Sequence, residues 1–141
     1  MDWSEIALRL GVATIVGAAV GLDRELRHKS AGVRTIGLVT LGTALAMLVV
    51  SYSSPDAAAA SRVLQGVVAG IGFLGAGVIM RHAGTIEGLT TAASIWTAAV
   101  LGAACGLGIW RPVVIASGLV FLLLVIAGRI EKRIKHRSEP G

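Results

Sequence analysis

The stretch LQGVVAGIGFLGAGVIM, residues 64–80, decides the fold of this chain. It contains no charged side chain, and as an α-helix rising about 1.5 Å per residue it would extend about 25 Å, close to the hydrocarbon thickness of a bilayer. Residues 70–75 also fit the glycine pattern of dinucleotide-binding loops, but that pattern needs a preceding strand and an internal turn, whereas the apolar run is continuous here. We therefore predict a membrane-spanning helix over residues 64–80.

The side chains of this segment sort by size along the predicted helix. One row, which contains Val67 and Ile71, is bulky throughout, and two neighbouring rows are mostly Gly and Ala. Because lipid tails are as apolar as leucine, membrane helices associate through close packing of small residues. We expect this helix to lie inside a bundle, with its bulky row toward lipid or an outer neighbour. The predicted packing positions are Gly66, Gly70, Gly72, Gly75 and Gly77.

Composition places the whole chain in a membrane. Of its 141 residues, 55% are hydrophobic and 15% charged, and the mean hydropathy of +0.80 is too high for an average soluble domain. The net charge is +5, but the basic residues are clustered and no groove-reading element accompanies them, so we expect no nucleic-acid partner. Cys105 is the single cysteine, which excludes a disulfide within the chain.

Four further apolar runs predict an all-α polytopic membrane protein, a bundle of five transmembrane helices. The predicted spans are residues 6–22, 35–52, 64–80, 92–109 and 113–127, which make a transmembrane domain over 1–128 followed by a basic cytoplasmic tail over 129–141. Segment 23–34 is a predicted charged loop, residues 53–56 a turn and residues 81–91 a polar loop. Thr90 or Thr91 is the predicted N-cap of the fourth helix, because a hydroxyl can accept from the unpaired amides of a first turn.

The distribution of basic residues predicts the orientation. Segments 23–34, 81–91 and 129–141 hold all of the 13 Lys and Arg residues except Arg9, Arg62 and Arg111. Lys and Arg are enriched in cytoplasmic segments of membrane proteins. We therefore predict that the N-terminus is outside and the C-terminus in the cytoplasm.

Polar side chains concentrate at the predicted cytoplasmic ends of the first, second and fourth helices. One interpretation is that Asp23, Arg24 and Glu25 are loop charges paired locally with Arg27 and Lys29, and exposed pairs of this kind contribute about 0–1 kcal/mol. The other is a site in which the start of the fourth helix attracts an anion or a carboxylate, and Asp23, Glu25 and Glu87 are candidate ligands for a hard cation such as Mg²⁺. The full candidate cluster is Asp23, Arg24, Glu25, Arg34, Thr35, Glu87, Thr90, Thr91, Ser94 and Trp96.

Motifs for chemistry are missing from the sequence. It shows no Ser/His/Asp or Cys/His constellation, no phosphate-binding loop and no zinc motif, so we expect no enzymatic activity. The central thirds of the predicted spans offer only Thr and Ser side chains, whereas an ion-coupled transport path normally has an ionisable or polar group at the membrane midplane. This weighs against an ion-coupled transporter formed by one chain.

Four motifs in order resemble those of the MgtC/SapB family of bacterial inner-membrane proteins. They are GLDRE at 21–25, AGVRT at 31–35, GIGFLGAG at 70–77 and GLTTAASIW at 88–96. The resemblance implies a multi-pass five-helix domain in the bacterial inner membrane, a role in adaptation to low magnesium and, in pathogens, in virulence. The best-known member is proposed to inhibit the F-type ATP synthase. We expect a short form, because the chain ends soon after the fifth span, without that member's C-terminal ACT-like domain.

From these inferences we expect a small integral membrane protein, surrounded by lipid, that acts by binding. Its expected partners are a second copy of itself, as in a homodimer, and another membrane protein; Mg²⁺ is the one small ligand considered. The alternative is a transporter or channel for Mg²⁺ or another cation.

Overall fold

The computed structural model describes residues 1–53, 56–82 and 85–137, without the side chains of His82, Ala127 and residues 129–137. Parts of the predicted turn at 53–56, the loop at 81–91 and the tail lie outside these residues. The described chain forms helices α1 (Trp3–Leu26), α2 (Val33–Ser53), α3 (Ala57–Gly77), α4 (Leu89–Leu107) and α5 (Trp110–Arg137). Strands β1 (Met80–His82) and β2 (Thr85–Glu87) pair antiparallel, with Met80 opposite Glu87.

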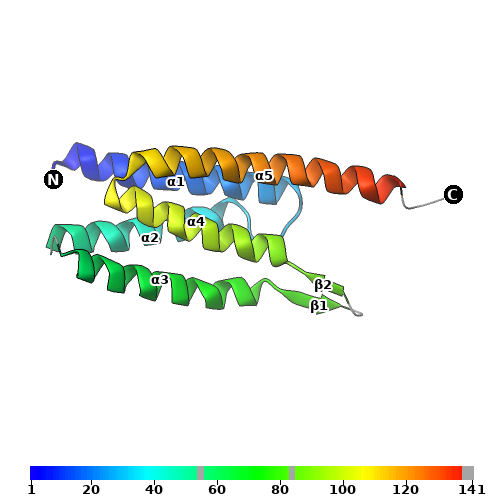
Figure 1. Ribbon diagram of the computed structural model, residues 1–141, viewed down its shortest axis with the longest axis horizontal. Helices are drawn as coiled ribbons and strands as arrows, with labels where there is room; N and C mark the ends of the chain where they lie inside the picture. The colour runs from blue at the N-terminus through cyan, green and yellow to red at the C-terminus, as the bar shows by residue number, and fades with distance from the viewer. Residues whose placement is uncertain (54–55, 83–84, 138–141) are drawn as a thin grey trace.

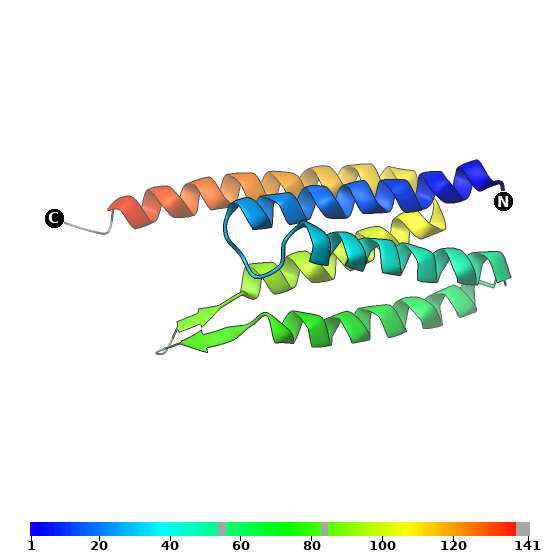
Figure 2. The same cartoon turned by 180° about the vertical axis from the view of Figure 1, so that it is seen from behind.

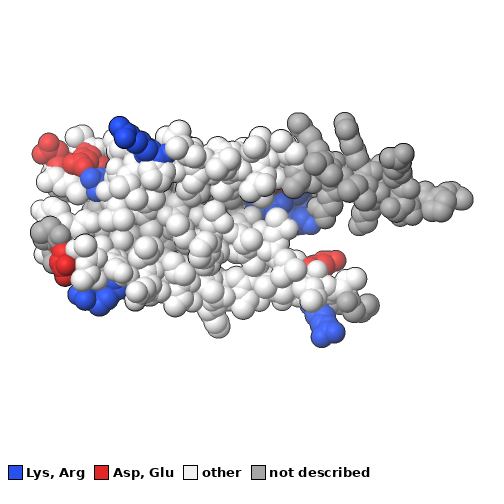
Figure 3. Space-filling view, in the orientation of Figure 1, with Lys and Arg blue, Asp and Glu red and all other residues white. Residues whose placement is uncertain are grey.

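The helices run side by side in one elongated bundle (Figure 1). By length and composition, α1, α2, α3 and α4 could each cross a membrane, and the apolar part of α5, Trp110–Ile126, is somewhat shorter. Charged atoms gather near the two ends of the visible face, with an uncharged band between them (Figure 3). The helical prediction is confirmed, and four spans are supported by length and composition.

The predicted helix bounds were too narrow or shifted. The helix α1 continues through residues 23–26, which the sequence predicts as loop. The helix α3 begins at Ala57 and includes residues 57–62, for which the sequence indicates a short interfacial helix leading into the span at 64–80. Asp56 explains the early start of α3, because its side-chain Oδ1 accepts a hydrogen bond from the Ala58 amide at 3.0 Å. Polar residues ended the predicted spans, but a helical backbone can continue past the end of an apolar run.

The helix α4, and not α3, lies at the centre of the bundle, packed against the other four helices. A Cβ added to Gly102 of α4 would lie 2.4 Å from the backbone oxygen of Thr40, and one added to Gly106 would lie 2.3 Å from that of Ala44. The backbones of α2 and α4 therefore touch. The close packing of small residues predicted for segment 64–80 is a property of α4.

The helix α3 lies at the edge of the bundle with its bulky row inward, the opposite of the prediction. Ile71 is buried, and Val67 and Val78 pack against the same apolar core. A Cβ added to Gly75 would lie within 4 Å of Ala92. For the other four predicted packing positions, Gly66, Gly70, Gly72 and Gly77, no atom of the described residues comes that close. Their contact with another molecule stays a prediction.

The start of α4 also differs from the prediction. Its N-cap is Gly88, with φ +90° and no side-chain hydrogen bond to the first turn, so the prediction of Thr90 or Thr91 was wrong. The β hairpin brings the chain back so closely that a Cβ at Gly88 would lie 2.0 Å from the Val78 oxygen. Glycine alone satisfies both the left-handed backbone and this approach.

Candidate functional site

One end of the bundle collects most of the predicted polar cluster. The end of α1, the start of α2, the β hairpin and the start of α4 all lie there, as the views from both sides show (Figures 1 and 2). Asp23, Arg24 and Glu25 belong to the last turns of α1 and are not loop residues. The helix therefore fixes the directions in which these three side chains project.

Asp23 and Arg27 tie the end of α1 to α5. The Arg27 Nε donates to both carboxylate oxygens of Asp23, at 2.9 and 3.1 Å, and its Nη2 donates to the Leu124 oxygen at 3.1 Å. Gly128 makes room for this guanidinium, because a Cβ there would lie 2.0 Å from Nη1. The predicted local pairing is confirmed for Asp23 and Arg27, and it also joins two helices.

Arg24 is buried, with 4% of its surface exposed, which the interpretation as a solvated loop charge did not predict. Its Nε lies 3.6 Å from Asp23 Oδ2. A guanidinium out of water is costly unless anions and acceptors surround it. The carboxylate of Asp23 therefore faces two guanidinium groups and is already used within the fold.

Glu25 stabilises the start of α2. Its Oε2 accepts a hydrogen bond from the Val33 amide at 2.9 Å, which places a carboxylate at the positive end of that helix. A Cβ at Gly32 would lie 2.6 Å from this oxygen, and one at Gly21 would lie 2.6 Å from the Val33 Cα. The first two motifs, GLDRE and AGVRT, therefore meet in space, and their glycines permit the contact.

A polar pocket of about 260 Å³ opens beside this cap. Lys29 and Arg34 supply positive charge, and Thr35 supplies an exposed hydroxyl. The pocket lining also includes Gly32 and Glu25. The carboxylate of Glu25 is partly neutralised by the α2 amide, so the basic side chains dominate the charge of the pocket.

The remaining residues of the predicted polar cluster do not line this pocket. Thr91 and Ser94 are buried in α4, where the Ser94 hydroxyl donates to the Thr90 oxygen at 2.7 Å. Glu87, on β2, and Trp96, on α4, are exposed. In the part of the chain that the structure describes, no three His, Cys, Asp or Glu side chains lie close enough to hold a metal ion. The candidate ligands Asp23, Glu25 and Glu87 are thus not brought together.

Arg9 forms a link at the opposite end of the bundle that was not predicted from the sequence. Its Nη1 donates to the Gly106 oxygen at 2.9 Å, and it pairs with Glu5. A cation is favourable there because it lies at the negative end of α4 and supplies a donor to the Gly106 oxygen. The spacing of four residues between Glu5 and Arg9, like that between Asp23 and Arg27, was visible in the sequence. The sequence did not show that these arginines also donate to backbone carbonyls of other helices.

Comparisons with known proteins give one consistent result. A family model described as MgtC family matches residues 10–133. Protein SrpB of Synechococcus elongatus is 42% identical over an alignment of 140 positions, which covers 90% of this chain and 76% of SrpB. Protein MgtC of Salmonella typhimurium is 39% identical over 129 residues, 92% of this chain and 55% of that protein.

A further match is the Escherichia coli protein named "Putative magnesium transporter YhiD". It is 35% identical over an alignment of 142 positions, which covers 96% of this chain and 66% of that protein. The chain therefore spans little more than half the length of MgtC and about two thirds of YhiD. No solved structure gave a significant match.

Proposed function

Because this chain belongs to the MgtC family, we propose that it is an inner-membrane protein that serves bacterial adaptation to low magnesium and acts by binding a membrane partner. The order of the four motifs, and the contact between the first two at one end of the bundle, support this proposal. In pathogens the same function would assist survival in the host. We propose neither enzymatic activity nor a nucleic-acid partner.

The proposed topology has five spans, with the N-terminus outside and the C-terminus in the cytoplasm. The apolar part of α5, Trp110–Ile126, would extend about 25 Å, enough for the hydrocarbon core. Figure 1 draws α5 alongside the bundle, with the start of α1 and the end of α5 toward opposite ends. The basic residues of segments 23–34 and 81–91 support a cytoplasmic location for their end of the bundle.

Binding is favoured over transport by one observation: the buried hydroxyls of α2 are satisfied by their own helix. The Thr40 hydroxyl donates to the oxygens of Ile36 and Gly37, at 3.1 and 2.9 Å, and the Thr43 hydroxyl donates to the Thr40 oxygen at 3.1 Å. No charged residue occurs between Arg34 and Asp56 in the sequence. An ion crossing one copy would therefore meet no charged ligand along α2 beyond Arg34.

We also propose that the protein acts as a homo-oligomer, such as a dimer. The row of α3 that contains Ala69, Gly72 and Ala76 is exposed and small, so a helix of a second copy could approach its backbone closely. This surface points away from α4, so the bundle itself would not have to change.

The alternative, passage of Mg²⁺ or another cation, is favoured by the name of YhiD. Purified protein in liposomes loaded with a Mg²⁺ indicator distinguishes the two. We expect Mg²⁺ entry equal to that of empty vesicles, and an ionophore added at the end confirms that the vesicles respond. Entry above that background that disappears with Glu25→Gln or Glu87→Gln would contradict the binding proposal.

A genetic experiment tests the physiological part. Deletion of the gene should slow growth in medium with micromolar magnesium and leave growth in millimolar magnesium unchanged. Re-expression of the chain should restore growth. Equal growth of the deletion and parent strains at low magnesium would contradict a role in this adaptation.

A further inference from the structure

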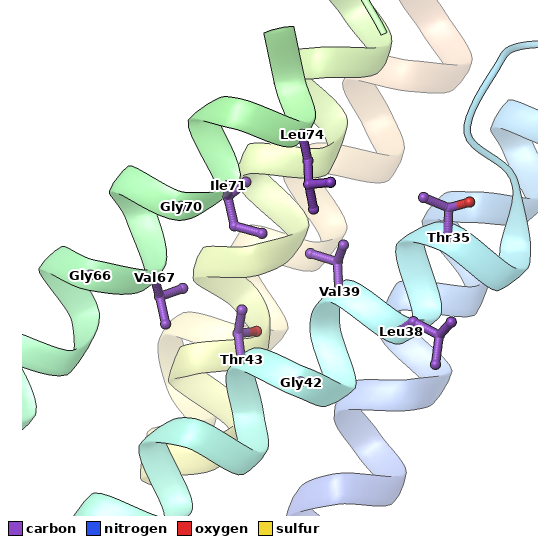
Figure 4. Close-up of a pocket in the computed structure, with 10 residues that line it drawn as sticks. All are labelled: Thr35, Leu38, Val39, Gly42, Thr43, Gly66, Val67, Gly70, Ile71 and Leu74. Carbon is purple, nitrogen blue, oxygen red and sulfur yellow. The ribbon is translucent and has the colours of Figure 1, made fainter. Parts of the chain in front are cut away.

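An apolar groove of about 540 Å³ separates α2 from α3. Val39 of α2 points toward Ile71 and Leu74 of α3, as Figure 4 shows, and Leu38 of α2 also lines the groove. The glycines widen the groove, because no described atom comes within 4 Å of a Cβ placed on them. These groove glycines are Gly42, Gly66 and Gly70.

The groove extends through about half of the membrane. Along α2 its lining runs from Thr35 to Thr43, which at about 1.5 Å per residue is about 12 Å. One leaflet contributes about 15 Å of hydrocarbon. Thr35 lies in the first turn of α2, so in the proposed membrane placement the groove starts at the membrane surface and ends near the midplane. Both views show α2 and α3 diverging toward the end that carries Thr35 (Figures 1 and 2).

The polar pocket adjoins one end of the groove at Thr35. Thr35 lines both cavities, and the pocket adds the cations of Lys29 and Arg34. The one carboxylate in the pocket lining, Glu25, is held by the Val33 amide at 2.9 Å. An apolar slot about 12 Å long therefore lies next to a surface pocket with a net positive charge.

We propose that this composite cavity binds an anionic phospholipid of the adjacent leaflet. One acyl chain occupies the groove between α2 and α3, and the phosphate lies in the pocket beside Lys29 and Arg34. The hydroxyl of Thr35, at the joint between the two, is available to donate to a phosphate or ester oxygen. Charge complementarity selects an anionic headgroup over a zwitterionic one.

A lipid fits the groove better than a helix of a second copy does. A transmembrane helix needs contact along about 30 Å of the membrane, whereas this groove extends about 12 Å and opens at one surface. An acyl chain enters from that surface and needs no polar partner below it. The row of α3 proposed for a second copy contains Gly72, and the groove lining contains Gly70, so the two sites are separable on one helix.

Native mass spectrometry of the full chain tests the proposal. The protein is extracted from nanodiscs that contain equal amounts of phosphatidylglycerol and phosphatidylcholine with the same acyl chains. We expect one phosphatidylglycerol to be retained per chain. Each basic residue near a membrane surface contributes about fivefold in affinity, so Lys29→Gln with Arg34→Gln should weaken retention about thirtyfold. Inorganic phosphate should not compete, because it has no acyl chain.

Matched variants test the two parts of the cavity. Gly70→Leu, or Gly42→Leu from the other wall, fills the groove and should abolish retention of both lipids. The control Gly118→Leu adds the same side chain to α5, where no described atom lies within 4 Å of its Cβ, and should retain phosphatidylglycerol. Arg62→Gln with Arg81→Gln removes two exposed cations elsewhere and should also leave retention unchanged.

Equal retention by the wild type and the Lys29/Arg34 double variant would overturn the headgroup site. Unchanged retention in both groove variants would overturn the acyl-chain site. A groove variant that instead changes the oligomer mass, with no lipid bound to the wild type, would assign the groove to a second copy and overturn the proposal. The lipid site needs the proposed membrane placement but not the magnesium role, and the growth and flux experiments test that role separately.

Discussion

Substitution of Gly102 by alanine tests the contact that organises the bundle. An added Cβ would lie 2.2 Å from the Thr43 Oγ1 and 2.4 Å from the Thr40 oxygen. Ordinary contacts of a Cβ begin near 3.4 Å. The Thr43 hydroxyl could rotate away, but the Thr40 oxygen belongs to the α2 backbone. Relief therefore requires α2 and α4 to separate by about 1 Å at this point.

The expected cost follows from two opposing effects. Overpacking of a close-packed interior costs about 1–3 kcal/mol. Alanine is favoured over glycine within a helix by about 1 kcal/mol, which offsets part of this cost. Gly118→Ala, on the exposed face of α5, gains the helix preference of alanine without overpacking, because no described atom lies within 4 Å of its Cβ. The difference between the two variants isolates the overpacking cost.

Thermal unfolding of both variants, in the same detergent and followed by circular dichroism, measures that difference. For a chain of this size about 1 kcal/mol corresponds to about 3 °C in Tm, so Gly102→Ala should melt about 3–9 °C below Gly118→Ala. If the two variants melt within about 1 °C of each other, α2 and α4 are not in backbone contact, and the assignment of α4 as the central helix fails.

Three further predictions address the polar end, the topology and the assembly. Glu25→Ala removes the acceptor for the Val33 amide and should destabilise the fold by about 1 kcal/mol in the same melting assay, whereas Glu25→Gln keeps the acceptor and should cost less; equal losses would contradict the cap. In a Cys105→Ser background, an impermeant thiol reagent should label Ser4→Cys but not Ser30→Cys in intact spheroplasts, and the reverse pattern would invert the proposed orientation. Gly72→Leu should lower the oligomer mass in detergent without changing Tm, and an unchanged mass would exclude this row as the interface.

Several features of the site were predictable because they depend on local sequence. The pairing of Asp23 with Arg27 follows from their spacing of four residues on a helix. The motif residues Glu25 and Arg34 were singled out, and the structure places both beside the polar pocket. The burial of Arg24 was not predictable, because it depends on where other helices cover the end of α1.

The sequence by itself determined that the chain is a helical membrane protein of this family. Long runs without charge fix the spans, since an unpaired charge or backbone group in hydrocarbon is costly, and the four ordered motifs fix the family. It could not determine which face of α3 points inward. In water a buried face is apolar and an exposed face polar, but in a bilayer both are apolar, so the pattern of Val67 and Ile71 against Gly66 and Gly70 fits either direction.

Only the tertiary structure decided that question. The small residues of α4 let its backbone lie directly against α2, which leaves α3 at the edge, with Val67 and Ile71 directed toward the core. The apolar groove between α2 and α3, and its junction with the basic pocket at Thr35, are consequences of that arrangement. Packing distances between helices far apart in sequence created this cavity, and no local pattern encodes them.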